Sequence, residues 1–466
     1  MKRRQRAAIS PTTARLSAYI ARALRTPLPR AVAEKTKHHL LDTLAAMVSG
    51  SKLHPGKLAV SYVKSLEGRR EACVAGSPLV TSAANAALAN GMLAHADETD
   101  DSHAASLTHP GCGVVPAALA MAERERRSGT ALLRAVALGY DVCCRLTLSL
   151  DPYRFREAGH STHSFGPMFG AAAAAGALAG LDARGARYLL SYAAQQASGL
   201  SCWMRDPHHV EKAFDFGGMP ARNGVAAAAM VAQGFTGVED VFDGERSFFA
   251  AYGRAAGPRG GGARPAELAR GLGRRYEILR ASIKRWPVGS PIQGPLDALE
   301  LLMRAHRFGA ADVARVVVRV WHQGANTTDN RDMPDICMQH LCAVMLLDGT
   351  VSFRSSHDAG RMRDPRVLAL RRRIELRGDA ALDRAMPSRQ GIVELQLRDG
   401  RRLQHHAKAV RGTPDNPMAR KEVEAKSLDL MSPVLGATRA RRLCGTVWRL
   451  EKLRDVRALR ALLRAR

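Results

Sequence analysis

Alanine-rich segments with helical periodicity recur through the first half of the chain. One of them, residues 31–50, places Leu40, Leu44 and Val48 on one stripe and stops at Gly50, which is typical of a core helix. Aromatic residues make up only 5% of the chain, so we expect closely packed helices rather than an aromatic-rich β-sandwich. Similar helical patterns lie at residues 79–95, 116–127, 129–149, 166–180, 184–199 and 220–233.

The pattern changes after about residue 260, where the sequence PRGGGARP predicts a flexible break. Apolar and polar residues alternate in RVVVRVW and in RIEL, and the alternating residues 393–397 are followed by Asp399-Gly400, a hairpin signal. We therefore expect an α+β module with an antiparallel sheet. From Pro417 onward the pattern is helical again, and a basic helix is expected through residues 450–463.

A chain of 466 residues is too long for one ordinary core. We predict a mainly α fold, in which N- and C-terminal segments form a large all-helical domain and a smaller α+β domain is inserted. The predicted bounds are 1–270 for the first part of the helical domain, 271–406 for the α+β lid domain and 407–466 for a helical segment that returns to the first domain.

The formal net charge of +27 at pH 7 invites comparison with nucleic-acid-binding proteins. However, the arginines are spread along the chain, without recognition-motif spacing, zinc-finger cysteines or an RNP-like aromatic run. We therefore expect no specific nucleic-acid partner. A small anionic substrate is a better match, because a positive field steers such a ligand to a basic cleft.

The eight cysteines form no CxxC pair, so we predict reduced thiols in a cytoplasmic protein. Missing CxxC runs also argue against an iron–sulfur cluster, although its ligands can be scattered along a chain. The first 33 residues hold eight Lys or Arg and no acid, and are expected to be an exposed basic N-terminus without a secretory apolar region. No apolar run of about 18 residues exists, so no membrane span is predicted.

Residues 88–116 combine four carboxylates and three histidines between two helical patterns. The carboxylates are close enough in sequence to repel one another, so some must be protonated, paired with cations or bound to a metal. Such a stretch suits proton transfer, but it also suits an ordinary polar loop whose carboxylates cap helices and pair with arginines. Its titratable residues are His95, Asp97, Glu98, Asp100, Asp101, His103 and His109.

Three later segments carry further candidate residues. His160 and His163 precede a glycine-flanked helix, whose N-terminus can hold an anion. Lys212 and Arg222 lie ahead of another alanine-rich helix and would clamp a carboxylate if they converge. Lys284 ends a strand-like run and either binds a carboxylate or is solvent-exposed. For either histidine taken alone, an ordinary loop histidine is the simpler interpretation, and for Lys212 and Arg222 it is a pair of solvated basic residues. His38 and His39 are expected on the polar side or the edge of their helix, as solvated rather than catalytic side chains.

Together these stretches resemble the MmgE/PrpD family, whose members include 2-methylcitrate dehydratase, cis-aconitate decarboxylase and iminodisuccinate epimerase. The resemblance implies an all-helical domain with an inserted α+β domain, a site in the cleft between them, a homodimer, and catalysis without metal or organic cofactor. The matching pieces are HHLLDTLAAMVSGS, LANGMLAHADETDDSHAASLTHPGCGVVPAALAMAE, GYDV, FGAAAAAGALAGLD, EKAFDFGGMPARNGVAAAAMVAQGFTG, IKRWP, TPDNPM and SPVLG.

The resemblance also implies site residues by position. Gln293 stands near the place where members often have a histidine, and a family tyrosine has no clear counterpart at 328–331. The implied catalytic residues are Glu98, His109, His160 or His163, Lys212 and Lys284, and the expected substrate-binding residues are Asp101, His103, Arg222 and Gln293.

The resulting hypothesis is a cofactor-independent lyase in which a histidine removes a proton next to a substrate carboxylate and lysines stabilise the developing charge. We expect dehydration of a 2-methylcitrate-like acid, with decarboxylation or epimerisation of a related acid as the alternative. Two rival hypotheses come from other classes. One is a metal-dependent hydrolase that uses His95, Asp97, Asp101 and His103, and the other is a non-catalytic basic binding protein.

Overall fold

The computed structural model of the chain describes residues 9–253 and 262–465. Their contacts divide the chain into two compact units. The first, called the helical unit here, consists of Met1–Ala96, Asp101–Ala281 and Met431–Arg466, and the second, the α/β unit, consists of Asp97–Asp100 and Ser282–Leu430. The basic residues before residue 9 and the first half of the glycine-rich break, residues 258–261, lie outside the described residues.

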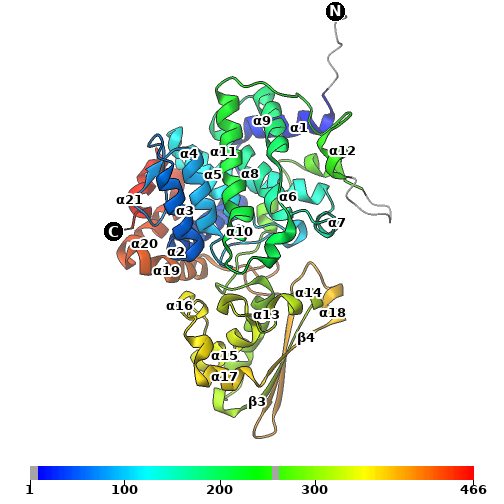
Figure 1. Cartoon of the computed structure of the whole chain (residues 1–466), viewed down its shortest axis with the longest axis vertical. Coiled ribbons are helices and arrows are strands. Elements are labelled where there is room, and N and C mark those ends of the chain that lie inside the picture. Colours follow the sequence, from blue (N-terminus) through cyan, green and yellow to red (C-terminus); the bar gives the residue numbers. More distant parts are fainter. Residues whose placement is uncertain (1–8, 254–261, 466) are drawn as a thin grey trace, which may run out of the picture. The chain divides into compact units, whose positions relative to one another are not determined.

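The helical unit is built around α8, which packs against α5, α6 and α11 (Figure 1). Small residues allow this packing: a Cβ on Gly170 of α8 would lie 2.5 Å from the carbonyl oxygen of Gly139 in α6. The longer helices are α1 (Pro11–Arg22), α2 (Arg30–Gly50), α3 (His54–Ser65), α4 (Ala83–Ala94), α5 (Pro110–Arg124), α6 (Gly129–Ser149), α8 (Thr162–Leu178), α9 (Ala183–Gln196), α11 (Met219–Ala232) and α20 (Ala437–Trp448).

Short elements complete the helical unit and carry several of the residues discussed below. They are α7 (Pro152–Glu157), α10 (Val210–Ala213), α12 (Phe248–Tyr252) and α21 (Arg460–Leu463), the two-residue strands β1 (Ala72–Cys73) and β2 (Val80–Thr81), the 3₁₀ turns η1 (Ala23–Arg25), η2 (Ala104–Ser106), η3 (Ser201–Arg205), η6 (Pro265–Ala269), η7 (Glu277–Arg280), η11 (Leu450–Lys452) and η12 (Val456–Leu459), and the π-helical turn η4 (Phe214–Gly218).

The α/β unit has a four-stranded sheet in the order β4-β3-β5-β6, of which β3 and β4 are labelled in Figure 1. Helix α13 packs against β5 and β6, and α15 packs against β4. The elements are α13 (Ser290–Ala305), η8 (Ala310–Asp312), β3 (Val313–Val320), α14 (His322–Thr328), η9 (Pro334–Ile336), α15 (Met338–Asp348), α16 (Phe353–Ser356), η10 (Arg361–Arg363), α17 (Pro365–Arg371), β4 (Ile374–Gly378), α18 (Ala380–Arg384), β5 (Gly391–Leu397) and β6 (Arg402–Ala407), and α19 (Arg420–Leu435) continues from this unit into the helical unit.

These elements confirm the predicted mainly α fold with a small α+β portion, and they correct several details. The sheet is mixed, because β4 pairs parallel to β3 whereas β5 and β6 are antiparallel. Helix α5 begins at Pro110, so Pro116 lies inside the helix. The expected basic helix through residues 450–463 is broken into η11, η12 and α21. Part of the expected exposed N-terminus folds as α1, with Leu16 and Ile20 buried.

Among the described residues, no helix is both long enough and apolar enough to cross a membrane.

Candidate functional site

The helical unit gathers four histidines around the ring of Phe216, and this group is called the histidine cluster below. The ring of Phe216 stacks on His163 at 4.0 Å and on His95 at 4.3 Å between ring centres. His109 lies 5.1 Å from His95 and 5.3 Å from His163, and His209 lies 5.1 Å from His95. All five side chains belong to buried residues.

Each histidine of the cluster sits at or near a helix end. His95 caps the C-terminus of α4, His109 and His209 occupy the N-cap positions of α5 and α10, and His163 is in the first turn of α8. Because helix ends are stabilised by the packing of the helices behind them, these side chains are held by a rigid scaffold.

The Phe216 ring is presented by a π-helical turn, a rare element that is often found at functional sites. Glycines allow this turn to pack closely against α4, because a Cβ on Gly91 of α4 would lie 2.3 Å from the carbonyl oxygen of Gly217. The turn and α4 therefore touch backbone to backbone, which places Phe216 beside His95 at the end of the same helix.

A cation accompanies the histidine cluster. The Lys212 ammonium lies 5.3 Å from the ring centres of both Trp203 and Phe216, at cation–π distance. Trp203 itself meets Phe216 edge-on at 4.7 Å and His163 at 5.4 Å. Burial, and then the positive charges of its neighbours, hold the pKa of His163 well below its usual range. His163 is therefore neutral near pH 7.

Lys284 is buried in the α/β unit, so the alternative of an exposed lysine is wrong. Its ammonium donates a hydrogen bond to the backbone oxygen of Glu98 at 2.6 Å. It also pairs with the carboxylates of Glu98 at 3.6 Å and of Asp100 at 3.7 Å. Two of the crowded carboxylates thus share one cation, which resolves their mutual repulsion.

Asp97 has a different partner, His357, which follows α16. The imidazole Nε2 of His357 lies 2.9 Å from the Asp97 carboxylate, which also accepts hydrogen bonds from the backbone and hydroxyl of Thr99. Although burial opposes both charges, this pairing lowers the pKa of Asp97 and raises the pKa of His357 to about 9. The pair is therefore an ion pair near neutral pH.

Asp101 and His103, which were expected to bind substrate, lie in two buried networks of the helical unit. Asp101 accepts a hydrogen bond from Tyr140 at 2.5 Å and from the backbone of Gly111 at 3.0 Å, and it lies 2.7 Å from Nδ1 of His39. His39 is fully buried, so its expected solvated position was wrong.

His103 is the second of these buried residues. Its Nε2 is 3.3 Å from the Glu277 carboxylate, and its Nδ1 is 2.8 Å from the hydroxyl of Ser106. Both ring nitrogens of His103 thus face polar groups within the same unit.

The remaining expected residues lie apart from the histidine cluster or have structural partners. His160 stacks on Phe155 at 4.5 Å and is only partly buried. The guanidinium of Arg222 donates to the side chain of Asn223 at 3.0 Å. Gln293 bonds the backbone at both ends of the 286–288 turn.

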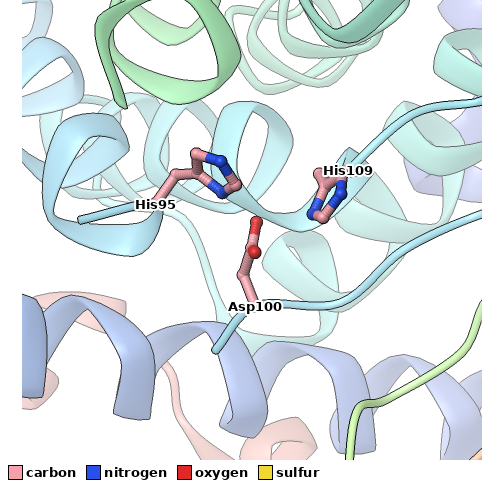
Figure 2. A group of neighbouring side chains, drawn as sticks. All are labelled: His95, Asp100 and His109. Carbon is pink, nitrogen blue, oxygen red and sulfur yellow. The ribbon is translucent and has the colours of Figure 1, made fainter. Parts of the chain in front are cut away.

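Figure 2 shows a group of side chains that offers metal-ligand atoms. His95, Asp100 and His109 come from one continuous stretch of chain, and their ligand atoms all lie within 4.8 Å of one another (Figure 2). Two imidazoles and one carboxylate are ligands that transition metals accept. The set differs from the predicted hydrolase ligands, because Asp97 and Asp101 are engaged by His357 and by Tyr140.

Sequence reasoning missed several members of these sites. His209 and Phe216 lie in the segment RDPHHVEKAFDFGG, where Lys212 was the candidate site residue. The adjacent histidine pair and the two glycines were the available signals, but a π-helical turn has no hydrophobic periodicity that would place the ring. His357 carries no local signal, because its partner Asp97 is 260 positions earlier in the sequence.

The chain is similar in sequence to several named proteins. The cis-aconitate decarboxylase-like protein oryM of Aspergillus oryzae is 28% identical over 304 residues, which cover 63% of this chain and 61% of that protein. The cis-aconitate decarboxylase of Homo sapiens is 26% identical over 93% of this chain and 90% of its own length. That of Aspergillus terreus is 23% identical, covering 94% of this chain and 92% of its own.

Two family profiles cover most of the sequence. The profile of the MmgE/PrpD N-terminal domain matches residues 14–259, and that of the MmgE/PrpD C-terminal domain matches residues 286–452. The relatives from Homo sapiens and Aspergillus terreus are named as decarboxylases, so lyases occur in the family. The resemblance inferred from the motifs is thereby confirmed, and the chain belongs to the MmgE/PrpD family.

Proposed function

We propose that this protein is a lyase that performs acid–base chemistry next to a carboxylate of a small di- or tricarboxylic acid. The observation that carries the proposal is the histidine cluster, in which the neutral imidazole of His163 lies beside Phe216 and the Lys212 ammonium. The proton acceptor and the cation are both side chains, so the proposed chemistry needs no metal or organic cofactor.

His163 has the properties of a general base. Such a base must be unprotonated at the working pH, and the low pKa of His163 meets that condition. The imidazole of His109, with its ring centre 5.3 Å away, provides a second group that can hold or return a proton. A positioned acid–base pair of this kind contributes roughly 100- to 10,000-fold to a rate.

Lys212 has the properties of an electrostatic stabiliser. When a proton or carbon dioxide leaves a carbon next to a carboxylate, negative charge spreads onto that carboxylate, and a fixed ammonium stabilises it. The same reasoning favours an anionic substrate. After burial, the positive charges of Arg156 and Lys212 are among the causes that lower the pKa of His163, and the same cations would attract a carboxylate placed beside this imidazole.

Decarboxylation of a cis-aconitate-like tricarboxylic acid is the first candidate reaction, because two of the relatives described above are named cis-aconitate decarboxylase and the third is named cis-aconitate decarboxylase-like. In this reaction one carboxylate leaves as carbon dioxide. Its bonding electron pair stays on carbon, conjugated with the double bond and the neighbouring carboxylate. A proton delivered by a histidine then completes the product.

Dehydration of a 2-methylcitrate-like hydroxy acid is the second candidate. It is favoured by the protonation state of His163, because a neutral imidazole is the form that removes a proton, and dehydration begins with that step. The hydroxyl then takes up a proton and leaves as water. Epimerisation of a related acid would share the first step and return the proton to the other face.

The expected partners remain part of this proposal. We propose a small anionic carboxylic acid as the ligand, a homodimer as the assembly, and the cytoplasm as the compartment. The excess of basic over acidic residues supports the anionic ligand, and the absence of CxxC pairs supports a reducing compartment.

The test is an NMR assay of the chelator-treated protein with a panel of cis-aconitate-like, citrate-like, malate-like and aminodicarboxylic acids. Carbon dioxide release, water loss or gain, or hydrogen exchange alone would each identify one reaction of this class. Activity that disappears on chelation and returns with added metal would instead support a metal-dependent hydrolase. No reaction with any acid would contradict the proposal.

A further inference from the structure

A short chain of hydrogen bonds links the π-helical turn to the start of α8. The hydroxyl of Ser161, the N-cap residue of α8, donates to the Asp215 carboxylate at 2.5 Å. It accepts from the indole N–H of Trp203 at 3.3 Å, and the backbone N–H of Ser161 donates to Gly199 at 3.0 Å. Two hydrogen bonds thus hold the Ser161 hydroxyl, and a third holds its backbone.

These bonds connect the two segments whose rings form the centre of the histidine cluster. Asp215 directly precedes Phe216, and Ser161 stands two residues before His163. The two segments are therefore joined twice, by the stacking of Phe216 on His163 and by the hydrogen bond from Ser161 to Asp215. Trp203 adds to both connections, because it contacts Phe216, His163 and Ser161.

Asp215 is enclosed and therefore acts through its neighbours. The residue is only 6% exposed. On one side it meets Gly199, where a Cβ would lie 2.7 Å from an Asp215 carboxylate oxygen and 1.9 Å from the Ser164 hydroxyl. The backbone of Gly199 has a φ of +126°, which an L side chain rarely adopts. The backbone at Gly199 thus closes over one side of the carboxylate.

We propose that Asp215 is a positioning residue, which sets the imidazole of His163 for proton transfer by holding Ser161 at the start of α8 and Phe216 against the ring. This inference rests on the proposed function, because a fixed imidazole speeds the reaction only if it is oriented toward the carbon that loses or gains the proton. A misplacement of about 1 Å in such a group costs on the order of 100-fold in rate.

The ionisation of Asp215 makes the positioning of His163 depend on pH. Burial first, and the nearby Glu211 carboxylate as well, raise the pKa of Asp215 to about 7, against the bonds from Ser161 and Ser164. Other titratable or charged groups close to this segment are Cys202 on η3, Lys212 on α10, His163 on α8, and His95 and His109, whose rings contact Phe216. The carboxylate that accepts strongly from Ser161 therefore forms as the pH rises through about 7.

The experiment compares Ser161→Ala, Asp215→Ala and Asp215→Asn with the wild-type chain and with Ser49→Ala. Ser49 is a matched control, because its buried hydroxyl bonds only backbone oxygens within α2. The measurements are kcat and KM on the acid that the wild type converts, the pH profile, and the NMR chemical shift and titration of the His163 ring protons, assigned with His163→Gln.

We expect Ser161→Ala and Asp215→Ala to lower kcat by roughly 10- to 100-fold with little change in KM. In both, the His163 signals should lose the ring-current shift caused by Phe216. Asp215→Asn keeps an oxygen that accepts from Ser161, so it should restore kcat to within a few fold and remove the rise of activity through pH 7. Ser49→Ala should match the wild type.

A stability measurement separates misfolding from mispositioning. An aspartate whose pKa is raised on folding loses its contribution to stability as the pH rises from about 4 to about 7. Asp215→Asn should therefore melt at a higher temperature than the wild type at pH 8.5, with a gap that closes toward pH 4.

Two outcomes would overturn the inference. One is a Ser161→Ala variant with wild-type kcat and unchanged His163 signals, and the other is an Asp215→Asn variant as impaired as Asp215→Ala. If the wild type converts no acid, the proposed function fails. The His163 signals then still decide whether Asp215 and Ser161 set the imidazole.

Discussion

The imidazole of His163 and the ring of Phe216 stack at 4.0 Å between centres, with their planes 8° apart. A second imidazole, that of His95, stacks on the same phenyl ring at 4.3 Å and 17°. Two near-parallel imidazoles on one phenyl ring leave each histidine little freedom to rotate. The π-helical turn that carries Phe216 therefore orients the bases of the histidine cluster.

His163 should matter far more than His160 for turnover. Replacing His163 with Gln is expected to lower kcat by roughly 100- to 10,000-fold, because the neutral imidazole beside Lys212 is lost. His160→Gln removes a ring that stacks on Phe155 outside the histidine cluster, and should cost less than tenfold. Steady-state kinetics of both variants decide between the two positions, and a larger loss in His160→Gln would reverse the assignment.

Lys212 should be required for the charge that develops on the substrate. We expect Lys212→Met to lower kcat by about 100- to 1,000-fold, the usual cost of removing one stabilising donor. Lys57→Met, which removes an exposed lysine from α3, is the matched control and should retain full activity. Circular dichroism spectra should be the same for both variants. Turnover by Lys212→Met at the rate of Lys57→Met would remove Lys212 from the mechanism.

Tyr140 should contribute to stability rather than to turnover. Tyr140→Phe removes the 2.5 Å hydrogen bond to Asp101 inside a fully buried network. We expect the free energy of unfolding to fall by about 1 to 3 kcal/mol, while kcat per folded molecule is unchanged. Urea unfolding and kinetics measure the two effects. A fall in kcat without a loss of stability would instead place Asp101 at the substrate, as the sequence analysis expected.

The ion pair of His357 and Asp97 should make stability depend on pH. Because folding raises the pKa of His357 to about 9, its contribution is fully present below about pH 6.5 and is lost as the pH rises through about 9. The shift corresponds to roughly 3 kcal/mol.

The corresponding measurement is urea unfolding of the wild type and His357→Gln at pH 6, 8 and 10. The difference in unfolding free energy should be largest at pH 6 and nearly absent at pH 10. His306→Gln, which removes an exposed histidine, serves as the control and should not change stability. A difference that stays constant with pH would show that His357 packs as a neutral ring.

The sequence predicted those elements whose signals are local. The segment 129–149 coincides with α6, since Ser128 caps its start and the apolar spacing is regular. The hairpin of β5 and β6 forms around Asp399-Gly400 as expected. By contrast, the parallel pairing of β4 with β3 joins strands about 60 residues apart, and no local pattern specifies the direction of such a pairing.

The candidate site, like the fold, could be predicted from the sequence only in part. The candidate residues Lys212, His109 and His163 come together in the helical unit, whereas His160 does not. His39 was expected at the surface because a helical pattern shows only which face is apolar, and cannot show that Asp101 arrives 62 positions later to pair with it. His209, Phe216 and Asp215 were missed because their arrangement depends on the π-helical turn.

The most direct test of the proposed proton transfer is the reaction in deuterated water. Wild-type protein, His163→Gln and Lys212→Met would be incubated after chelation with a cis-aconitate-like and a 2-methylcitrate-like acid, and substrate and product followed by NMR. We expect the wild type to form product and to place deuterium on the carbon next to a carboxylate, and both variants to be slowed at least 100-fold. Product formed at wild-type rate by either variant, or no reaction and no exchange by the wild type, would contradict the proposed mechanism.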